Sequence, residues 1–302
     1  MHGSLRAPVQ PASPVPAVLI LAGSGPTDRN GDSTLIDGRV GTLKDLDDLL
    51  ATWGIASLRY DKLNTGMTGL GPHTDLTKVG FDLYTKMASD GLAFLSRRPG
   101  IAPGRVTVIG HSEGALIALV LATKPSSRIH SLGLLMPLPM RYLDQLRQQV
   151  HEIAVLQGAT EAQLAAVDES LDKAIHTIRT TGQALTGLDP GVQPLFQPQN
   201  ARFLQQADSH APVQLAARVP RQIPIFIACG THDIQVRCAD VTRLRDAASN
   251  RPDAVTEFVE LNGVNHVLKE DTSKDEAEYG RPHPFSAQLR QTLSAFLQRT
   301  SR

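Results

Sequence analysis

The sequence predicts an α/β protein with a mostly parallel central sheet, helices on both faces of the sheet and a helical cap insertion. Two observations lead to this prediction. Short apolar runs alternate with stretches of helical periodicity over most of the 302 residues. Such a strand–helix–strand series implies right-handed crossovers and parallel strands. The alternation stops once, over residues 140–215, where no strand pattern occurs.

The first half of the chain supplies four strands and their connecting helices. Residues 1–14 are rich in proline and predict a flexible arm that precedes an α/β domain over residues 15–302. The apolar runs predict strands over 16–21, 55–60, 105–109 and 131–136. Apolar residues at helical spacing predict helices over 42–53, 75–97 and 115–122.

The second half contains the insertion, 140–215, and then returns to the alternation. Two apolar stripes within 140–180 predict helices that pack either onto the sheet or into a cap over a pocket. Glycine, proline and glutamine dominate 182–199, which predicts a loop. Strands are predicted over 223–228 and 255–261, and helices over 239–248 and 284–297.

The composition excludes several classes of function. The 30 Lys and Arg residues balance 30 Asp and Glu residues, and aromatic residues make up only 4%. A nucleic-acid-binding protein needs a basic surface and often aromatic platforms, so no nucleic-acid partner is expected. No apolar run approaches the roughly 20 residues that span a bilayer, so no membrane span is expected either. Nothing in the sequence indicates the oligomeric state.

Two cysteines, Cys229 and Cys238, are too few for a disulfide framework in a chain of this length. We interpret them as free thiols in a reducing compartment. The apolar run after the N-terminal prolines predicts a buried strand better than the core of a signal peptide. Together these points predict a cytoplasmic protein.

The strongest chemical signal is Gly110-His111-Ser112-Glu113-Gly114, between a predicted strand and a predicted helix. A turn this sharp strains the serine backbone, and glycines two places before and after it remove the side chains that would collide. The Ser112 hydroxyl is then presented at the carboxyl edge of the sheet, where the helix dipole stabilises negative charge. Taken alone, the motif is equally consistent with a serine that only caps the helix.

Two further loops carry the partners that a serine nucleophile needs. Asp233 comes shortly after the strand predicted over 223–228, and His266 comes in the same way after 255–261. Loops that follow parallel strands meet at one edge of the sheet, so both side chains are expected near Ser112. A hydroxyl becomes nucleophilic when a base takes its proton and a carboxylate orients that base. The order Ser112, Asp233, His266 therefore predicts the catalytic triad of a hydrolase.

Four other residues compete for these roles. His232 is adjacent to Asp233, and neighbouring side chains usually diverge. His283 follows no predicted strand, and Asp240 lies farther along, near the next helix. His111, beside the nucleophile, is interpreted as a packing or hydrogen-bonding residue.

No cofactor or metal site is predicted. Gly23 and Gly25 follow a strand, as in dinucleotide-binding proteins, but Asp28 occupies the place of the third glycine in that fingerprint. His151 begins a pattern like that of a zinc-protease helix, but Val155 stands where its second histidine belongs.

With these motifs the chain resembles the serine esterases of the α/β-hydrolase superfamily, in the group that includes serine aminopeptidases and monoacylglycerol lipases. It looks most like bacterial carboxylesterases that carry Gly-Ser-Gly-Pro-x-Asp-Arg-x-Gly after the first core strand, here residues 23–31. Those esterases also share Arg59-Tyr60-Asp61-Lys62 and the Gly-His-Ser-Glu-Gly turn. The resemblance covers residues 16–139 and 220–300.

The resemblance implies an oxyanion hole made of two backbone N–H groups, those of Ser24 and Glu113. It also implies a small-molecule ester as substrate, cleaved through an acyl-enzyme intermediate without a cofactor. Ala22 replaces a frequent histidine of the family, but a backbone donor does not depend on it. Residues 63–66 replace an Arg-Gly-x-Gly segment, which affects local substrate contacts rather than the triad.

Two alternatives stay open at this point. The same triad hydrolyses peptides and amides, and an exopeptidase would need an acidic group such as Glu152 or Asp144 to bind a free amine. A non-catalytic binding module of the same fold is the other alternative, although such modules commonly lack one member of the triad.

Overall fold

The computed structural model describes residues 1–9, 11–125 and 127–300, and the chain forms two compact units. The first unit comprises Met1–Gly69, Thr85–Pro139 and Pro212–Arg302. The second comprises Leu70–Tyr84 and Met140–Ala211. Within the part of the chain that the structure describes, every helix is too short or too polar to cross a membrane.

A sheet with the strand order β1-β3-β2-β4-β5-β6-β7 forms the middle of the first unit. Parallel pairing joins β2 (Val15–Leu21), β3 (Ala56–Tyr60), β4 (Ile101–His111), β5 (Ser131–Leu135), β6 (Ile225–Gly230) and β7 (Thr256–Leu261). The strand β1 (Gly3–Arg6) runs antiparallel to β3. The mostly parallel sheet confirms the predicted fold class.

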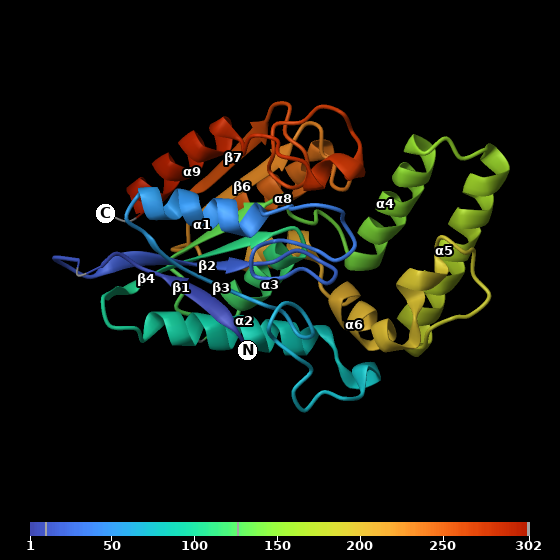
Figure 1. Ribbon diagram of the computed structural model, residues 1–302, viewed down its shortest axis with the longest axis horizontal. Coiled ribbons are helices and arrows are strands. Elements are labelled where there is room, and N and C mark those ends of the chain that lie inside the picture. The colour runs from blue at the N-terminus through green and yellow to red at the C-terminus, as the bar shows by residue number, and fades with distance from the viewer. Residues whose placement is uncertain (10, 126, 301–302) are drawn as a thin grey trace. The chain divides into compact units, whose positions relative to one another are not determined.

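Helices cover both faces of this sheet. Figure 1 shows α1 (Thr42–Thr52) and α9 (Ala287–Thr300) on one face, and α2 (Phe81–Ser96) and α3 (Glu113–Ala122) on the other. The helix α7 (Pro212–Arg218) packs against α3 and α8 (Cys238–Ser249), and α8 packs against β6 and β7. Because both faces are covered, β5 and β6 are buried along their whole length and lack the alternation of a half-exposed strand.

The N-terminal segment differs from the flexible arm predicted over residues 1–14. Gly3–Arg6 form β1, whose register sets Leu5 beside Leu58 of β3. The N–H of His2 also donates to the Thr68 hydroxyl at 2.8 Å. Main-chain pairing with a neighbouring strand orders these residues, and a segment this short carries no apolar pattern that would reveal it. Residue 10 of the predicted arm lies outside the described residues.

The second unit has a core of its own. It contains α4 (Tyr142–Leu156), α5 (Glu161–Thr181) and α6 (Pro198–Asp208), with the short turns η1 (Leu76–Lys78) and η2 (Gln193–Phe196). The apolar stripes of α4 and α5 pack against each other and against α6, through residues that include Leu143, Leu171, Ile175, Ile178 and Leu204. The buried carboxylate of Asp208 accepts hydrogen bonds from Arg141 and Arg179.

The bounds of this unit differ slightly from the prediction of a cap over 140–215. The segment Leu70–Tyr84 belongs to it, while α7 belongs to the first unit because it packs against α3 and α8. Helix α6 begins within the predicted loop 182–199, at Pro198. That this unit acts as a cap stays a prediction.

Candidate active site

Ser112 stands at the turn between β4 and α3. Its backbone adopts φ 54° and ψ −119°, a conformation that costs a non-glycine residue about 1–3 kcal/mol. A Cβ on Gly110 would lie 2.1 Å from the Gly114 carbonyl oxygen, and a Cβ on Gly114 would lie 2.4 Å from that of Leu21. The Ser112 N–H donates to the Leu135 carbonyl at 2.9 Å. The two glycines therefore permit a strained serine at the N-terminus of α3.

Asp233 lies in the loop between β6 and α8, and its two carboxylate oxygens have different partners. Oδ1 accepts the N–H groups of Gln235 at 2.7 Å and Val236 at 2.9 Å. Oδ2 accepts from Nδ1 of His266 at 2.8 Å, and the two side chains are 0% and 5% exposed. Because Nδ1 carries the proton of this hydrogen bond, Nε2 of the neutral ring has a lone pair and can act as a base.

His266 lies in a tight loop after β7 that Asn265 organises. The Oδ1 atom of Asn265 accepts the N–H groups of Val267 and Lys269, each at 3.1 Å. This loop comes very close to the Asp233 loop at Gly230, where a Cβ would lie 2.2 Å from the carbonyl oxygen of Val264. The absence of a side chain at Gly230 thus lets the two loops meet.

His111 connects the turn that carries Ser112 with the His266 loop. Its Nε2 donates to the His266 carbonyl oxygen at 2.8 Å, and the two ring centroids are 4.9 Å apart. Burial and, next, the neighbouring His266 ring lower the pKa of His111 to about 3. The ring is therefore neutral at pH 7 and does not repel a positive charge that forms on His266.

The loop after β2 lies against the serine turn. A Cβ on Gly23 would lie 3.3 Å from the Ser112 Cβ and 3.2 Å from Nδ1 of His111, so a side chain there would press on both residues. Nζ of Lys62 donates to the Gly23 carbonyl oxygen at 2.5 Å and lies 3.7 Å from Oε1 of Glu113. Burial lowers the pKa of Lys62, although the Glu113 carboxylate opposes this change.

Partly buried hydrogen bonds join the two segments on which the resemblance depends. Arg29 donates to the Asp61 carboxylate from its backbone N–H at 2.8 Å, from Nε at 3.0 Å and from Nη2 at 2.5 Å. Arg59 donates to Oδ1 of Asn30 at 2.6 Å. The loop over residues 23–31 is thereby anchored to the end of β3.

Comparisons with known proteins identify the fold but no close relative. No protein-family model matches the chain, and no curated protein is similar to it in sequence. The esterase Est1E of Butyrivibrio proteoclasticus, solved with ferulic acid, is 13% identical with a TM-score of 0.56, over 99% of this chain and 92% of that one. The Pyrococcus furiosus esterase Pf2001 is 16% identical with a TM-score of 0.57, over 96% and 85%. The monoacylglycerol lipase of Paleococcus ferrophilus is 16% identical with a TM-score of 0.56, over 99% of both chains.

The chain has the α/β-hydrolase fold.

In this structure, the residues that compete for the predicted roles have other partners. The ring of His232 contacts the hydroxyl of Thr231, and Nε2 of His283 lies 2.8 Å from Oε2 of Glu278. Asp240 pairs with an arginine near the start of α8. Among the described residues, no three His, Cys, Asp or Glu side chains form a group that could hold a metal ion.

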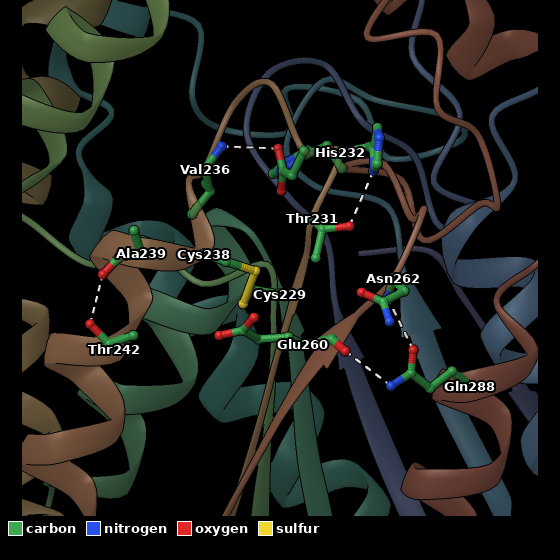
Figure 2. The surroundings of a disulfide bond; sticks show 12 residues. Cys229, Thr231, His232, Val236, Cys238, Ala239, Thr242, Glu260, Asn262 and Gln288 are labelled. Carbon is green, nitrogen blue, oxygen red and sulfur yellow. Dashed lines mark hydrogen bonds and ion pairs between the residues drawn. A yellow bond between two sulfur atoms is a disulfide. The ribbon is translucent and has the colours of Figure 1, made fainter.

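Cys229 and Cys238 form a disulfide with a Cα–Cα distance of 5.3 Å, so the prediction of free thiols is wrong. Cys229 lies in β6 and Cys238 begins α8, and Figure 2 shows the bond at the base of the loop that carries Thr231, His232 and Val236. The turn from strand to helix brings the two residues together, which their spacing in the sequence does not reveal. The two cysteines therefore no longer support a reducing compartment, and a cytoplasmic location stays a prediction.

Removal of this disulfide is expected to destabilise the protein. In Cys229→Ala/Cys238→Ala, the free energy of unfolding is expected to fall by about 2–3 kcal/mol, because a link between residues nine apart restricts the unfolded chain by that amount. Urea unfolding measures the change. Dithiothreitol should reproduce it in the wild type and have no effect on the double variant. Equal stability of the oxidised wild type and the variant would contradict the expectation.

Proposed function

We propose that the protein is a serine hydrolase that cleaves carboxylic esters, with Ser112 as nucleophile, His266 as general base and Asp233 as the group that orients His266. The buried hydrogen bond between His266 and Asp233, in loops at the same sheet edge as the strained Ser112 turn, carries this proposal. The similar folds of two esterases and a lipase support esters as the substrate class. The motif over residues 23–31 supports a likeness to bacterial carboxylesterases.

The reaction proceeds in two stages. Oγ of Ser112 attacks the ester carbonyl carbon while Nε2 of His266 takes the hydroxyl proton. The N–H groups of Ser24 and Glu113 stabilise the oxyanion that forms. His266 then gives its proton to the leaving alcohol as the C–O bond breaks, and the acyl group stays on Ser112. In the second stage His266 takes a proton from a water molecule, whose oxygen attacks the acyl carbon. His266 then returns this proton to Oγ of Ser112 as the bond between Oγ and the acyl carbon breaks and the acid leaves.

The observations favour an ester over a peptide or amide. An exopeptidase would need a carboxylate that is available for a free amine. Asp144 instead accepts from Arg179 at 2.7 Å, and Glu152 accepts from Gln148 at 3.0 Å. We therefore propose a small-molecule ester as the substrate, and no step of the reaction needs a cofactor.

Ser112→Ala tests the proposal. With p-nitrophenyl acetate and butyrate, kcat is expected to fall on the order of 10⁵-fold, because the nucleophile and its acyl-enzyme are lost. A fluorophosphonate probe should label the wild type and Ser249→Ala, which changes an exposed serine at the end of α8, but not Ser112→Ala.

Three outcomes would contradict this proposal. Ser112→Ala that hydrolyses esters as fast as the wild type would exclude Ser112 as nucleophile. Faster turnover of aminoacyl naphthylamides than of esters would favour the amide hydrolase. A folded wild type that the probe does not label would favour a binding module.

A further inference from the structure

The carbonyl side of the Gly23–Ser24 peptide group has a charged partner. This peptide bond is trans, and the C=O and N–H of a planar trans peptide point in opposite directions. Nζ of Lys62 donates to the Gly23 carbonyl oxygen at 2.5 Å. A bond that fixes this carbonyl therefore also fixes the direction of the Ser24 N–H. A charged donor on the carbonyl polarises the peptide group and makes its N–H a stronger donor.

Lys62 is also paired with the residue that carries the second proposed oxyanion donor. Its Nζ lies 3.7 Å from Oε1 of Glu113, and the two side chains are 8% and 2% exposed. A buried ammonium requires a counter-charge and hydrogen bonds to remain charged. Glu113 is the first residue of α3 and follows Ser112 directly. The lysine thus links the loop after β2 with the N-terminus of α3.

The backbone that carries this ammonium is held in place on both sides. The Lys62 carbonyl accepts from the N–H of Thr65 at 3.2 Å and from its hydroxyl at 3.0 Å. The preceding residue, Asp61, binds Arg29 in the same loop that contains Gly23. The segment that contains Lys62 is therefore bound to the loop that contains Gly23 at two points, and the ammonium holds the peptide group in one orientation.

We infer that Lys62 is a positioning residue of the oxyanion hole, which directs the Ser24 N–H at the oxyanion through its bond to the Gly23 carbonyl and uses Glu113 as its counter-charge. The inference rests on the proposed function. Because the oxyanion forms only after attack on the ester, loss of Lys62 should weaken binding of the transition state far more than binding of the substrate.

The test compares the wild type with Lys62→Met and with Lys62→Met/Glu113→Gln, which removes both charges so that neither is left buried and unpaired. In both variants kcat for p-nitrophenyl acetate is expected to fall about 10- to 100-fold, with KM changed less than about twofold. A trifluoromethyl ketone forms a serine adduct that carries an oxyanion. Its inhibition constant is expected to rise by the factor by which kcat/KM falls.

Arg251→Met is the matched control. Arg251 is also a buried cation that donates to backbone carbonyls, those of Pro220 and Ile223 among them, near the amino ends of β6 and β7. Its loss should lower the melting temperature but leave kcat within about twofold at a temperature far below melting.

Two results would overturn the inference while the proposed function stands. One is a Lys62→Met/Glu113→Gln variant with the kcat of the wild type. The other is a variant with a lower kcat whose inhibition constant for the trifluoromethyl ketone equals that of the wild type. A wild type without Ser112-dependent hydrolysis would overturn the proposed function, and this inference with it.

Discussion

Asp233→Asn is expected to lower kcat for ester hydrolysis on the order of 10⁴-fold while the protein stays folded. The reason lies in the two oxygens of Asp233. The N–H groups of Gln235 and Val236 need an acceptor at the position of Oδ1, so the asparagine presents its amide oxygen there. Its NH₂ group then faces Nδ1 of His266, which must become an acceptor. The ring proton moves to Nε2, and the ring can no longer take the proton of Ser112.

Steady-state kinetics with p-nitrophenyl butyrate measures this loss, and circular dichroism reports whether the fold is kept. Asp240→Asn is the matched control, since Asp240 pairs with arginines in and before α8 and its loss should leave kcat unchanged. Adding Asp233→Asn to His266→Ala should cause little further loss, because residues that act as a unit are not additive. An Asp233→Asn variant that retains a tenth of the wild-type kcat would contradict the role given to Asp233.

The sheet could be predicted because its central strands carry short, mostly apolar runs, whereas some smaller elements leave no such pattern. Strand β5 reads Ser-Leu-Gly-Leu-Leu and is buried at every position. Helix α6, whose sequence does not predict it, is rich in Gln and Asn and buries only Ala201, Leu204, Ala207 and Asp208. Strand β1 depends on main-chain pairing with β3 rather than on its side chains. Local composition therefore predicts the central strands of this fold, but not the edge strand β1 or the polar helix α6.

The same distinction applies to the candidate site. Gly110 and Gly114 are required by the backbone of the Ser112 turn, and such a requirement is visible in the sequence as a residue type at a fixed spacing. The bond from His111 to the His266 carbonyl joins residues 155 positions apart, and the bond from Lys62 to Gly23 joins residues 39 apart. These contacts depend on how loops meet in space, which no spacing along the chain encodes.

Asp61→Asn is expected to lower the free energy of unfolding by about 3–5 kcal/mol, the cost of breaking a buried ion pair by removing one partner. The Asp61 carboxylate is 0% exposed and accepts three hydrogen bonds from Arg29 and one from the Met67 N–H, at 2.8 Å. An amide offers one acceptor oxygen and turns two N–H donors toward groups that are themselves donors. The guanidinium of Arg29 then keeps its charge without the carboxylate that balances it.

The pH dependence of this difference distinguishes a charge effect from a packing effect. Burial would raise the pKa of Asp61, but the hydrogen bonds from Arg29 and Met67 outweigh it and hold the pKa below the ordinary value of 3.8. A lowered folded-state pKa gives stability that is complete above 3.8 and is lost as the pH falls through the lower value. The difference in the free energy of unfolding between wild type and Asp61→Asn, measured by urea unfolding, should therefore be full at pH 7 and shrink below pH 3.8.

Asp90→Asn is the control, because it breaks an exposed pair with Lys86 and should lower the free energy of unfolding by less than about 0.5 kcal/mol. Two results would show that the charge of Asp61 does not hold the loop of residues 23–31 against β3. One is a loss of stability in Asp61→Asn no larger than that in Asp90→Asn, and the other is a loss that does not change with pH.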